Sequence, residues 1–117
     1  MANDTDRLLD LCRKLPGTTE DVKWGNDLVF SVGGKMYAVF ELPDYESIGV
    51  KVDPTVFPVL TQQPGVIPAP YLAHHSWIKV SSRAMPREAL EDLIRESHAI
   101  VAQKLSKKIR TSLGIQA

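Results

Sequence analysis

The order of hydrophobic and polar residues predicts a chain that alternates between amphipathic helices and short strands. Residues 3–17 (NDTDRLLDLCRKLPG) predict a first helix, because apolar side chains are spaced for one buried stripe at Leu8, Leu11, Cys12 and Leu15. Asp4 or Thr5 can cap its start, and the Pro-Gly pair at 16–17 ends it. We interpret Cys12, the single cysteine, as a small core residue that has no partner for an internal disulfide.

Strands follow this helix. Residues 28–32 and 35–42 alternate with period two on either side of Gly33-Gly34, and both central positions of such a hairpin turn require positive φ. Residues 46–53 (ESIGVKVD) add a third strand, and Asp53 then caps a short helix over 54–63. The proline-rich residues 64–70 predict a loop that can include a short edge strand, and residues 76–80 (SWIKV) predict the next strand.

A long closing helix is predicted over residues 85–110. Pro86 suits its first position, and its apolar stripe consists of Leu90, Leu93, Ile94, Ser97, Val101 and Leu105. The element order is therefore α-β-β-β-α-β(β)-α. Hairpins joined to single-stripe helices predict an α+β fold. We expect one two-layer domain over residues 1–117, in which an antiparallel sheet of four to five strands is covered on one face by helices.

Composition narrows the class of protein. The 117 residues suit one domain, and 44% hydrophobic with 24% charged residues is ordinary for a soluble globular protein. No apolar run approaches the roughly 20 residues of a membrane span, and the acidic, polar start does not resemble a signal peptide. A cytoplasmic protein is expected. The net charge is zero for the whole chain but is unevenly distributed, because the segment from Lys79 onward contains eight Lys and Arg and only four Asp and Glu.

Five segments in the same order together resemble the MmcQ/YjbR family of small bacterial proteins. They are LPGTTEDVKWG (15–25), VFSVGGKMYAVF (29–40), IGVKVDP (48–54), PGVIPAPYL with HHSWIKV (64–80), and ESHAIVAQKLSKK (96–108). The resemblance implies the fold shared by frataxin-like (CyaY-like) proteins and type III secretion chaperones. It also implies a DNA-binding role, which has been suggested for this largely uncharacterised family from its wing-like hairpins. It implies no catalytic residues.

The residues that suggest metal binding or catalysis do not form recognisable sites. Neighbouring strand residues point to opposite faces, so His74 and His75 could not easily share one metal ion, and no third or fourth ligand stands at a metal-site spacing. Ser97 and His98 diverge by about 100° on a helix, and the Ser97 hydroxyl most simply bonds a backbone carbonyl. We therefore expect no metal, no cofactor and no enzymatic activity.

A binding surface is predicted on the sheet face turned away from the helices. If Ile78 and Val80 face the helices, then Trp77 and Lys79 face the other way. The same rule applies to the other strands, where the residues predicted to face inward are Met36, Ala38, Phe40, Ile48, Val50 and Val52. The residues assigned to the open face are then Lys35, Tyr37, Val39, Lys51, Trp77 and Lys79. Aromatic rings there can stack bases while lysines meet phosphates. Alternatively, Trp77 is covered by residues 68–72 (PAPYL) and the lysines only solvate the surface.

The basic tail KLSKKIR could add phosphate contacts through Lys104, Lys107, Lys108 and Arg110. Alternatively, these cations only complement the negative dipole end of a helix.

Three functions remain open from the sequence. The first is a non-enzymatic binding protein that binds DNA or other nucleic acid with modest, salt-sensitive affinity. The second is a protein-interaction module, monomeric or dimeric, that uses the open sheet face or an edge strand. The third is a small-molecule binder or enzyme of unknown reaction, centred on Trp24, Tyr71, His74 and His75.

Overall fold

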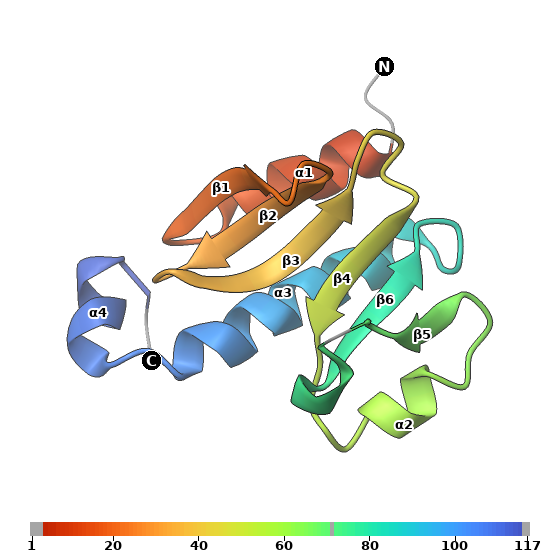
Figure 1. Cartoon of the computed structure of the whole chain (residues 1–117). Coiled ribbons are helices and arrows are strands. Elements are labelled where there is room, and N and C mark those ends of the chain that lie inside the picture. The colour runs from red at the N-terminus through yellow and green to blue at the C-terminus, as the bar shows by residue number, and fades with distance from the viewer. Residues whose placement is uncertain (1–3, 71, 116–117) are drawn as a thin grey trace.

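The computed structural model describes residues 4–70 and 72–115, which form two layers (Figure 1). In chain order the elements are α1 (Asp4–Lys14), β1 (Thr18–Lys23), β2 (Asp27–Val32), β3 (Lys35–Glu41), β4 (Ser47–Lys51), α2 (Phe57–Leu60), β5 (Val66–Pro68), the 3₁₀ helix η1 (Ala73–His75), β6 (Trp77–Ser81), α3 (Arg87–Gln103) and α4 (Lys107–Ser112). The six strands make one antiparallel sheet in the order β1-β2-β3-β4-β6-β5. Helices α1 and α3 cover one face, and the opposite face is turned toward the viewer in Figure 1. The predicted two-layer α+β fold is confirmed.

The core lies between the sheet and helices α1 and α3. Phe30, Phe40 and Ile78 contribute from the strands, while Leu8 and Ile94 contribute from the helices, and all five are at most 1% exposed. Burial of each such side chain stabilises the fold by roughly 1.5–3 kcal/mol. The helix stripes read from the sequence therefore do face the sheet.

The Gly33-Gly34 turn is confirmed as the connection between β2 and β3. The φ angles are +58° at Gly33 and +80° at Gly34, a backbone region that residues other than glycine rarely adopt. A Cβ on Gly33 would also lie 2.7 Å from both Cδ atoms of Leu105, which follows α3. Gly33 is thus required both for the turn and for the close approach of the C-terminal segment.

Three elements differ from the prediction. The sheet has six strands instead of four to five, since β1 is a mostly exposed edge strand whose sequence, TTEDVK, has no apolar alternation. The closing helix does not run to residue 110: α3 ends at Gln103, and the Ser106 hydroxyl caps a separate α4 by accepting from the Ile109 amide at 3.2 Å. The helix predicted over 54–63 is reduced to α2, although the Asp53 carboxylate does accept from the Thr55 amide at 2.8 Å, as predicted for a cap, in the turn that precedes α2.

The face assignment on β3 is wrong at Lys35, Met36 and Tyr37 because a bulge shifts the register. Lys35, predicted to be on the open face, pairs with the core residue Val32 and so leaves the sheet on the helix-covered side. Phe30 pairs with Ala38 but Ser31 pairs with Met36, so Tyr37 is the extra residue between them. Tyr37, predicted to be on the open face, instead points into the helix layer and is 0% exposed. Met36, predicted to face inward, lies on the open face.

Candidate functional site

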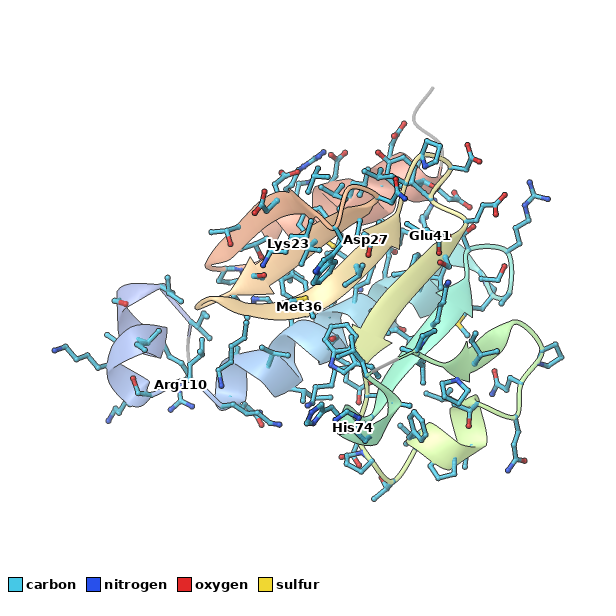
Figure 2. All side chains as sticks on the ribbon, viewed as in Figure 1. Lys23, Asp27, Met36, Glu41, His74 and Arg110 are labelled. Atoms are coloured by element: carbon cyan, nitrogen blue, oxygen red, sulfur yellow. The ribbon has the colours of Figure 1, made fainter. Side chains whose placement is uncertain are left out.

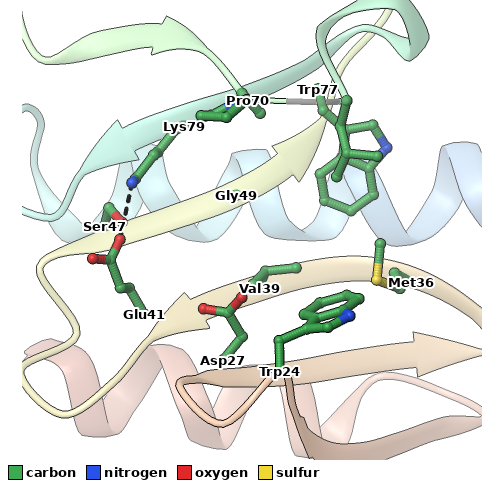
Figure 3. Close-up of a pocket in the computed structure, with 12 residues that line it drawn as sticks. Trp24, Asp27, Met36, Val39, Glu41, Ser47, Gly49, Pro70, Trp77 and Lys79 are labelled. Atoms are coloured by element: carbon green, nitrogen blue, oxygen red, sulfur yellow. Dashed lines mark hydrogen bonds and ion pairs between the residues drawn. The ribbon is translucent and has the colours of Figure 1, made fainter.

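A pocket of about 560 Å³ occupies the open face of the sheet (Figure 3). We call it the sheet pocket; its lining residues are Trp24, Asp27, Met36, Val39, Glu41, Ser47, Gly49, Ala69, Pro70, Leu72, Trp77 and Lys79. Its size falls within the range of about 300–1,000 Å³ typical of small-molecule sites. The lining is largely apolar with a few polar groups at one end, which is also typical of such sites.

Trp24 forms one wall and stands in an unfavourable backbone conformation. It begins the turn between β1 and β2, where its φ is +53° and that of Gly25 is +79°. Two successive positive φ angles normally call for Asn or Gly in the first position, and a bulky residue there costs roughly 1–3 kcal/mol. The indole is nevertheless 69% exposed at the mouth of the sheet pocket, so core packing does not account for it.

Trp77 forms the facing wall. Its side chain leaves the sheet on the open face as predicted, but it is only 5% exposed, so the prediction of an exposed Trp77 is wrong. The indole lies 3.9 Å from the position that a Cβ on Gly49 would take, and Pro70 lies beside it in Figure 3. The Ala69 amide also donates to the Trp77 carbonyl at 3.0 Å. Ala69, Pro70 and Leu72, which follow β5, line the pocket together with the nearly buried Trp77, in agreement with the alternative interpretation.

Polar groups gather at the end of the sheet pocket where β3 ends. The Glu41 carboxylate accepts from the Ser47 hydroxyl at 2.6 Å and from Lys79 Nζ at 2.9 Å, and these two bonds lower the pKa of Glu41. Lys79 is therefore already paired. The Asp27 carboxylate points into the pocket, and within residues 4–70 and 72–115 no ion pair or side-chain hydrogen bond reaches it (Figure 3).

Three lysines influence one another at the opposite end of the sheet, and we call them the lysine cluster: Lys35, Lys51 and Lys104. Lys35 begins β3, Lys51 ends β4, and Lys104 follows α3. Partial burial lowers the pKa of Lys51, and the neighbouring amine of Lys104 and the charge of Lys35 lower it further. In the part of the chain that the structure describes, none of the three forms an ion pair with a carboxylate.

Two histidines adjoin the lysine cluster. The ring centroids of His74 and His75, in the η1 helix, lie 3.9 Å apart, and the Ser76 carbonyl after η1 accepts from the Val52 amide just beyond β4. The pKa of His75 is lowered chiefly by His74, and also by Lys51 and Lys104. Figure 2 shows His74 at the far end of the sheet from Asp27 and Glu41. No group of three metal-ligating side chains occurs among residues 4–70 and 72–115.

The basic tail does not act as one surface. Lys104 joins the lysine cluster, whereas Lys107 and Lys108 are exposed on α4. Arg110 donates to the Gln103 carbonyl at 3.2 Å and so caps the end of α3 (Figure 2), in agreement with the alternative of a helix-end role.

Ser97 and His98 have separate structural contacts. The Ser97 hydroxyl donates to the Tyr37 carbonyl at 2.6 Å and accepts from the Lys51 amide at 2.9 Å. His98 Nε2 lies 2.8 Å from the Pro16 carbonyl oxygen, and the His98 ring meets the Tyr37 ring edge-on at 5.0 Å. As predicted, Ser97 bonds a backbone carbonyl, although that carbonyl belongs to the sheet and not to its own helix.

Buried polar groups beneath the sheet are likewise satisfied. The Tyr37 hydroxyl lies 2.8 Å from Thr18 Oγ1 and donates to the Cys12 carbonyl at 3.0 Å. Burial raises the pKa of the Cys12 thiol to about 12, which makes it an unreactive core residue as expected.

The predicted set of binding residues is thus divided among several places. Lys35, Lys51 and Lys104 come together, Lys79 lies at the far end of the sheet pocket, and Tyr37 is in the core. The residues of the predicted small-molecule site are also separated: Trp24 lines the sheet pocket, and His74 and His75 adjoin the lysine cluster. Tyr71 lies outside the described residues.

Sequence reasoning missed the contributions of Asp27 and Met36 to the sheet pocket. A signal for this region was present, because Trp24 stands directly before Gly25, in the three-residue turn between Lys23 and Asp27 where small or polar residues are usual.

The fold and the pocket define a class of protein: a small two-layer α+β domain with one helix-covered sheet face and one open, hollowed face. The chain belongs to the YjbR family, whose model matches residues 13–100. Among solved structures it is similar to the Deinococcus radiodurans protein DR2400, which carries a DUF419 domain, with 31% identity and a TM-score of 0.85 over 96% of this chain and 88% of that one. A Pseudomonas syringae protein shares the fold at 23% identity, with a TM-score of 0.69 over 86% of this chain and 99% of that one. No curated protein matches.

Among the described residues, no helix has both the length and the apolar character needed to cross a membrane.

Proposed function

We propose that this chain acts by binding and not by catalysis, and that it binds nucleic acid with modest affinity through the lysine cluster. One observation carries the proposal: Lys35 and Lys104, from two other parts of the fold, act on Lys51, and none of the three pairs with a carboxylate among the described residues. The two side chains that could have suggested a nucleophilic pair, Ser97 and His98, are occupied by structural contacts.

Mutual repulsion makes the lysine cluster a site for anions. Burial and the two other lysines hold the pKa of Lys51 below its usual value, so the charged form is disfavoured in the free protein. A phosphate placed among Lys35, Lys51 and Lys104 would reverse this effect and raise that pKa. Successive phosphates of a nucleic-acid backbone supply such anions.

The remaining charge of the protein keeps the affinity modest. The formal net charge is zero, and Asp27 and Glu41 lie at the other end of the open face. With only the three clustered lysines in contact, binding to a single strand should weaken with salt at a log–log slope of about −2, given about −0.7 per phosphate contact.

Fluorescence anisotropy with a labelled single-stranded oligonucleotide and a labelled duplex tests the proposal between about 20 and 150 mM salt. The double substitution Lys51→Gln with Lys104→Gln should weaken binding and bring the salt slope toward zero. The matched control is Arg7→Gln with Lys14→Gln, which removes the same charge from exposed positions on α1, in the helix layer. No binding at the lowest salt, or equal losses in the two double variants, would refute this function.

A further inference from the structure

The two ends of the sheet pocket differ in charge. At one end stand Asp27 and Glu41, of which Glu41 is neutralised by Lys79 at 2.9 Å. At the other end the lining residue Trp77 leads to the lysine cluster, because Lys51 pairs with Trp77 across β4 and β6. A ligand that fits both ends has hydrogen-bond donors on one side and an anion on the other.

The middle of the sheet pocket is built for a flat ring. Trp24 and Trp77 approach from opposite sides, and Met36 and Val39 lie between them on β3 (Figure 3). Gly49 has no side chain and so leaves the pocket floor open. A Cβ there would fit without a clash, because its nearest neighbour would be Val39 Cβ at 3.6 Å. The exposed indole of Trp24 is the wall on which a nucleobase can stack whatever its identity, while the nearly buried Trp77 closes the opposite side of the pocket.

Asp27 supplies the group that distinguishes one base from another. Its carboxylate is free of partners in the described part of the chain and points into the pocket. An ionised carboxylate only accepts hydrogen bonds, so it favours ring edges that carry N–H donors. Two adjacent donors can engage both carboxylate oxygens, as N1–H and N2–H₂ of guanine do, whereas uracil places its single N3–H between two repelling carbonyl oxygens.

We propose that the sheet pocket receives one unpaired nucleobase, preferentially guanine, with its donor edge at Asp27 and its phosphate toward the lysine cluster. This inference rests on the proposed function and adds to it a single-stranded ligand and a base preference. It also explains the exposed Trp24 in its left-handed turn, because stacking on a bound base requires an aromatic ring that is accessible in the free protein.

The test uses mononucleotides, so it does not depend on binding of a long strand. The two tryptophans give two indole N–H signals in a ¹⁵N–¹H spectrum, which the Trp24→Phe variant assigns. Titration with GMP, AMP, CMP and UMP should shift both signals, with GMP binding most tightly and UMP most weakly. Ribose 5-phosphate, which has no base, should leave the Trp24 signal in place.

Three variants make the test specific. Asp27→Asn should weaken GMP binding about tenfold and remove its advantage over AMP, because the amide presents a donor where guanine also donates. Trp24→Ala should weaken all four nucleotides about tenfold. Gly49→Val adds a side chain to the pocket floor and should likewise weaken binding of all four nucleotides, which the Trp24 indole signal reports. Lys14→Gln, in the helix layer, is the matched control.

The outcomes separate this inference from the proposed function. Indole signals that none of the nucleotides moves at millimolar concentration, or a ranking that Asp27→Asn leaves unchanged, would overturn the base site even if strands bind through the lysine cluster. GMP binding in the pocket without binding of oligonucleotides at low salt would support the base site and overturn the nucleic-acid function.

Discussion

Replacement of Ser97 by alanine is the substitution that most directly tests how the sheet is held to α3. The Ser97 side chain is 0% exposed and connects two strands, since it donates to the Tyr37 carbonyl at 2.6 Å and accepts from the Lys51 amide at 2.9 Å. The Tyr37 carbonyl belongs to the bulge residue of β3, which has no residue opposite it on β2. Alanine would leave both backbone groups without this partner.

The expected loss of stability follows from these two bonds. A buried polar group left unsatisfied costs about 1–3 kcal/mol, so two would cost roughly 2–6 kcal/mol. The better helix propensity of alanine returns up to about 0.5 kcal/mol, and water can reach the partly buried Lys51 amide. We expect a net loss of about 2–4 kcal/mol, a large share of the roughly 5–15 kcal/mol typical of a domain.

Urea denaturation, followed by tryptophan fluorescence and by far-UV circular dichroism, measures this loss. At a slope of about 2 kcal/mol per molar urea, the middle of the usual range of about 1–3, the midpoint should fall by about 1–2 M. Ser112→Ala is the matched control: its hydroxyl donates to the Ile109 carbonyl at 2.8 Å, but on the exposed α4, so its change should stay within about 0.5 kcal/mol. A loss below about 1 kcal/mol for Ser97→Ala at an unchanged slope would contradict the reasoning.

Three further predictions concern other parts of the fold. Gly33→Ala should lower the free energy of unfolding, measured by urea denaturation, more than Gly34→Ala does. Both residues have positive φ, which costs an alanine about 1–2 kcal/mol, but only a Cβ at Gly33 would meet Leu105, at 2.7 Å. Equal losses in the two variants would contradict this reasoning. Cys12, whose pKa burial raises to about 12, should resist thiol reagents at neutral pH and react only as the chain unfolds in urea; rapid native labelling would disprove it. Neighbouring cationic groups lower the folded-state pKa of His75 below 6.5, so between that lowered pKa and 6.5 the unfolded state binds more protons and stability should rise with pH. His75→Gln should flatten this rise in pH-dependent denaturation, and identical profiles would exclude the mechanism.

Periodicity predicted the elements whose two faces have different environments. The β2–β3 hairpin was identified because apolar alternation flanks two glycines, and α3 was identified because its apolar stripe faces the sheet. Strand β1 was missed because nothing covers either face of most of its residues, so only backbone pairing with β2 defines it. The break between α3 and α4 was missed because Leu105 continues the apolar stripe past the point where the helix ends.

The faces of β3 were harder to predict, for a physical reason. Alternation assigns faces only while the ladder is regular, and the bulge at Tyr37 breaks it. Met36, Tyr37 and Ala38 can all be buried, so their side chains do not reveal which one is the extra residue. The choice is made by contacts distant in sequence, namely the bonds of the Tyr37 hydroxyl to Thr18 and to the Cys12 carbonyl.

The candidate site was predicted only in part. Lys35, Lys51 and Lys104 were each identified as cations, but their convergence depends on where α3 ends relative to β3 and β4. The sheet pocket could not be predicted from spacing, because Trp24 and Trp77 are 53 positions apart and the segment that covers Trp77 has no strong pattern of its own.

The bulge connects the core, the sheet pocket and the lysine cluster. It turns Tyr37 toward α3 and places Met36 in the pocket, while the buried carbonyl of Tyr37 accepts a hydrogen bond from the Ser97 hydroxyl. The same hydroxyl holds the amide of Lys51, so one buried group on α3 positions a wall residue of the pocket and the end of β4 that carries the lysine. Since both bonds are lost together in Ser97→Ala, loss of stability and loss of nucleotide affinity should appear together in that variant, although its side chain touches neither ligand site. A regular β3 would instead place Tyr37 on the open face and Met36 in the core, and the pocket between the two tryptophans would lose its present floor.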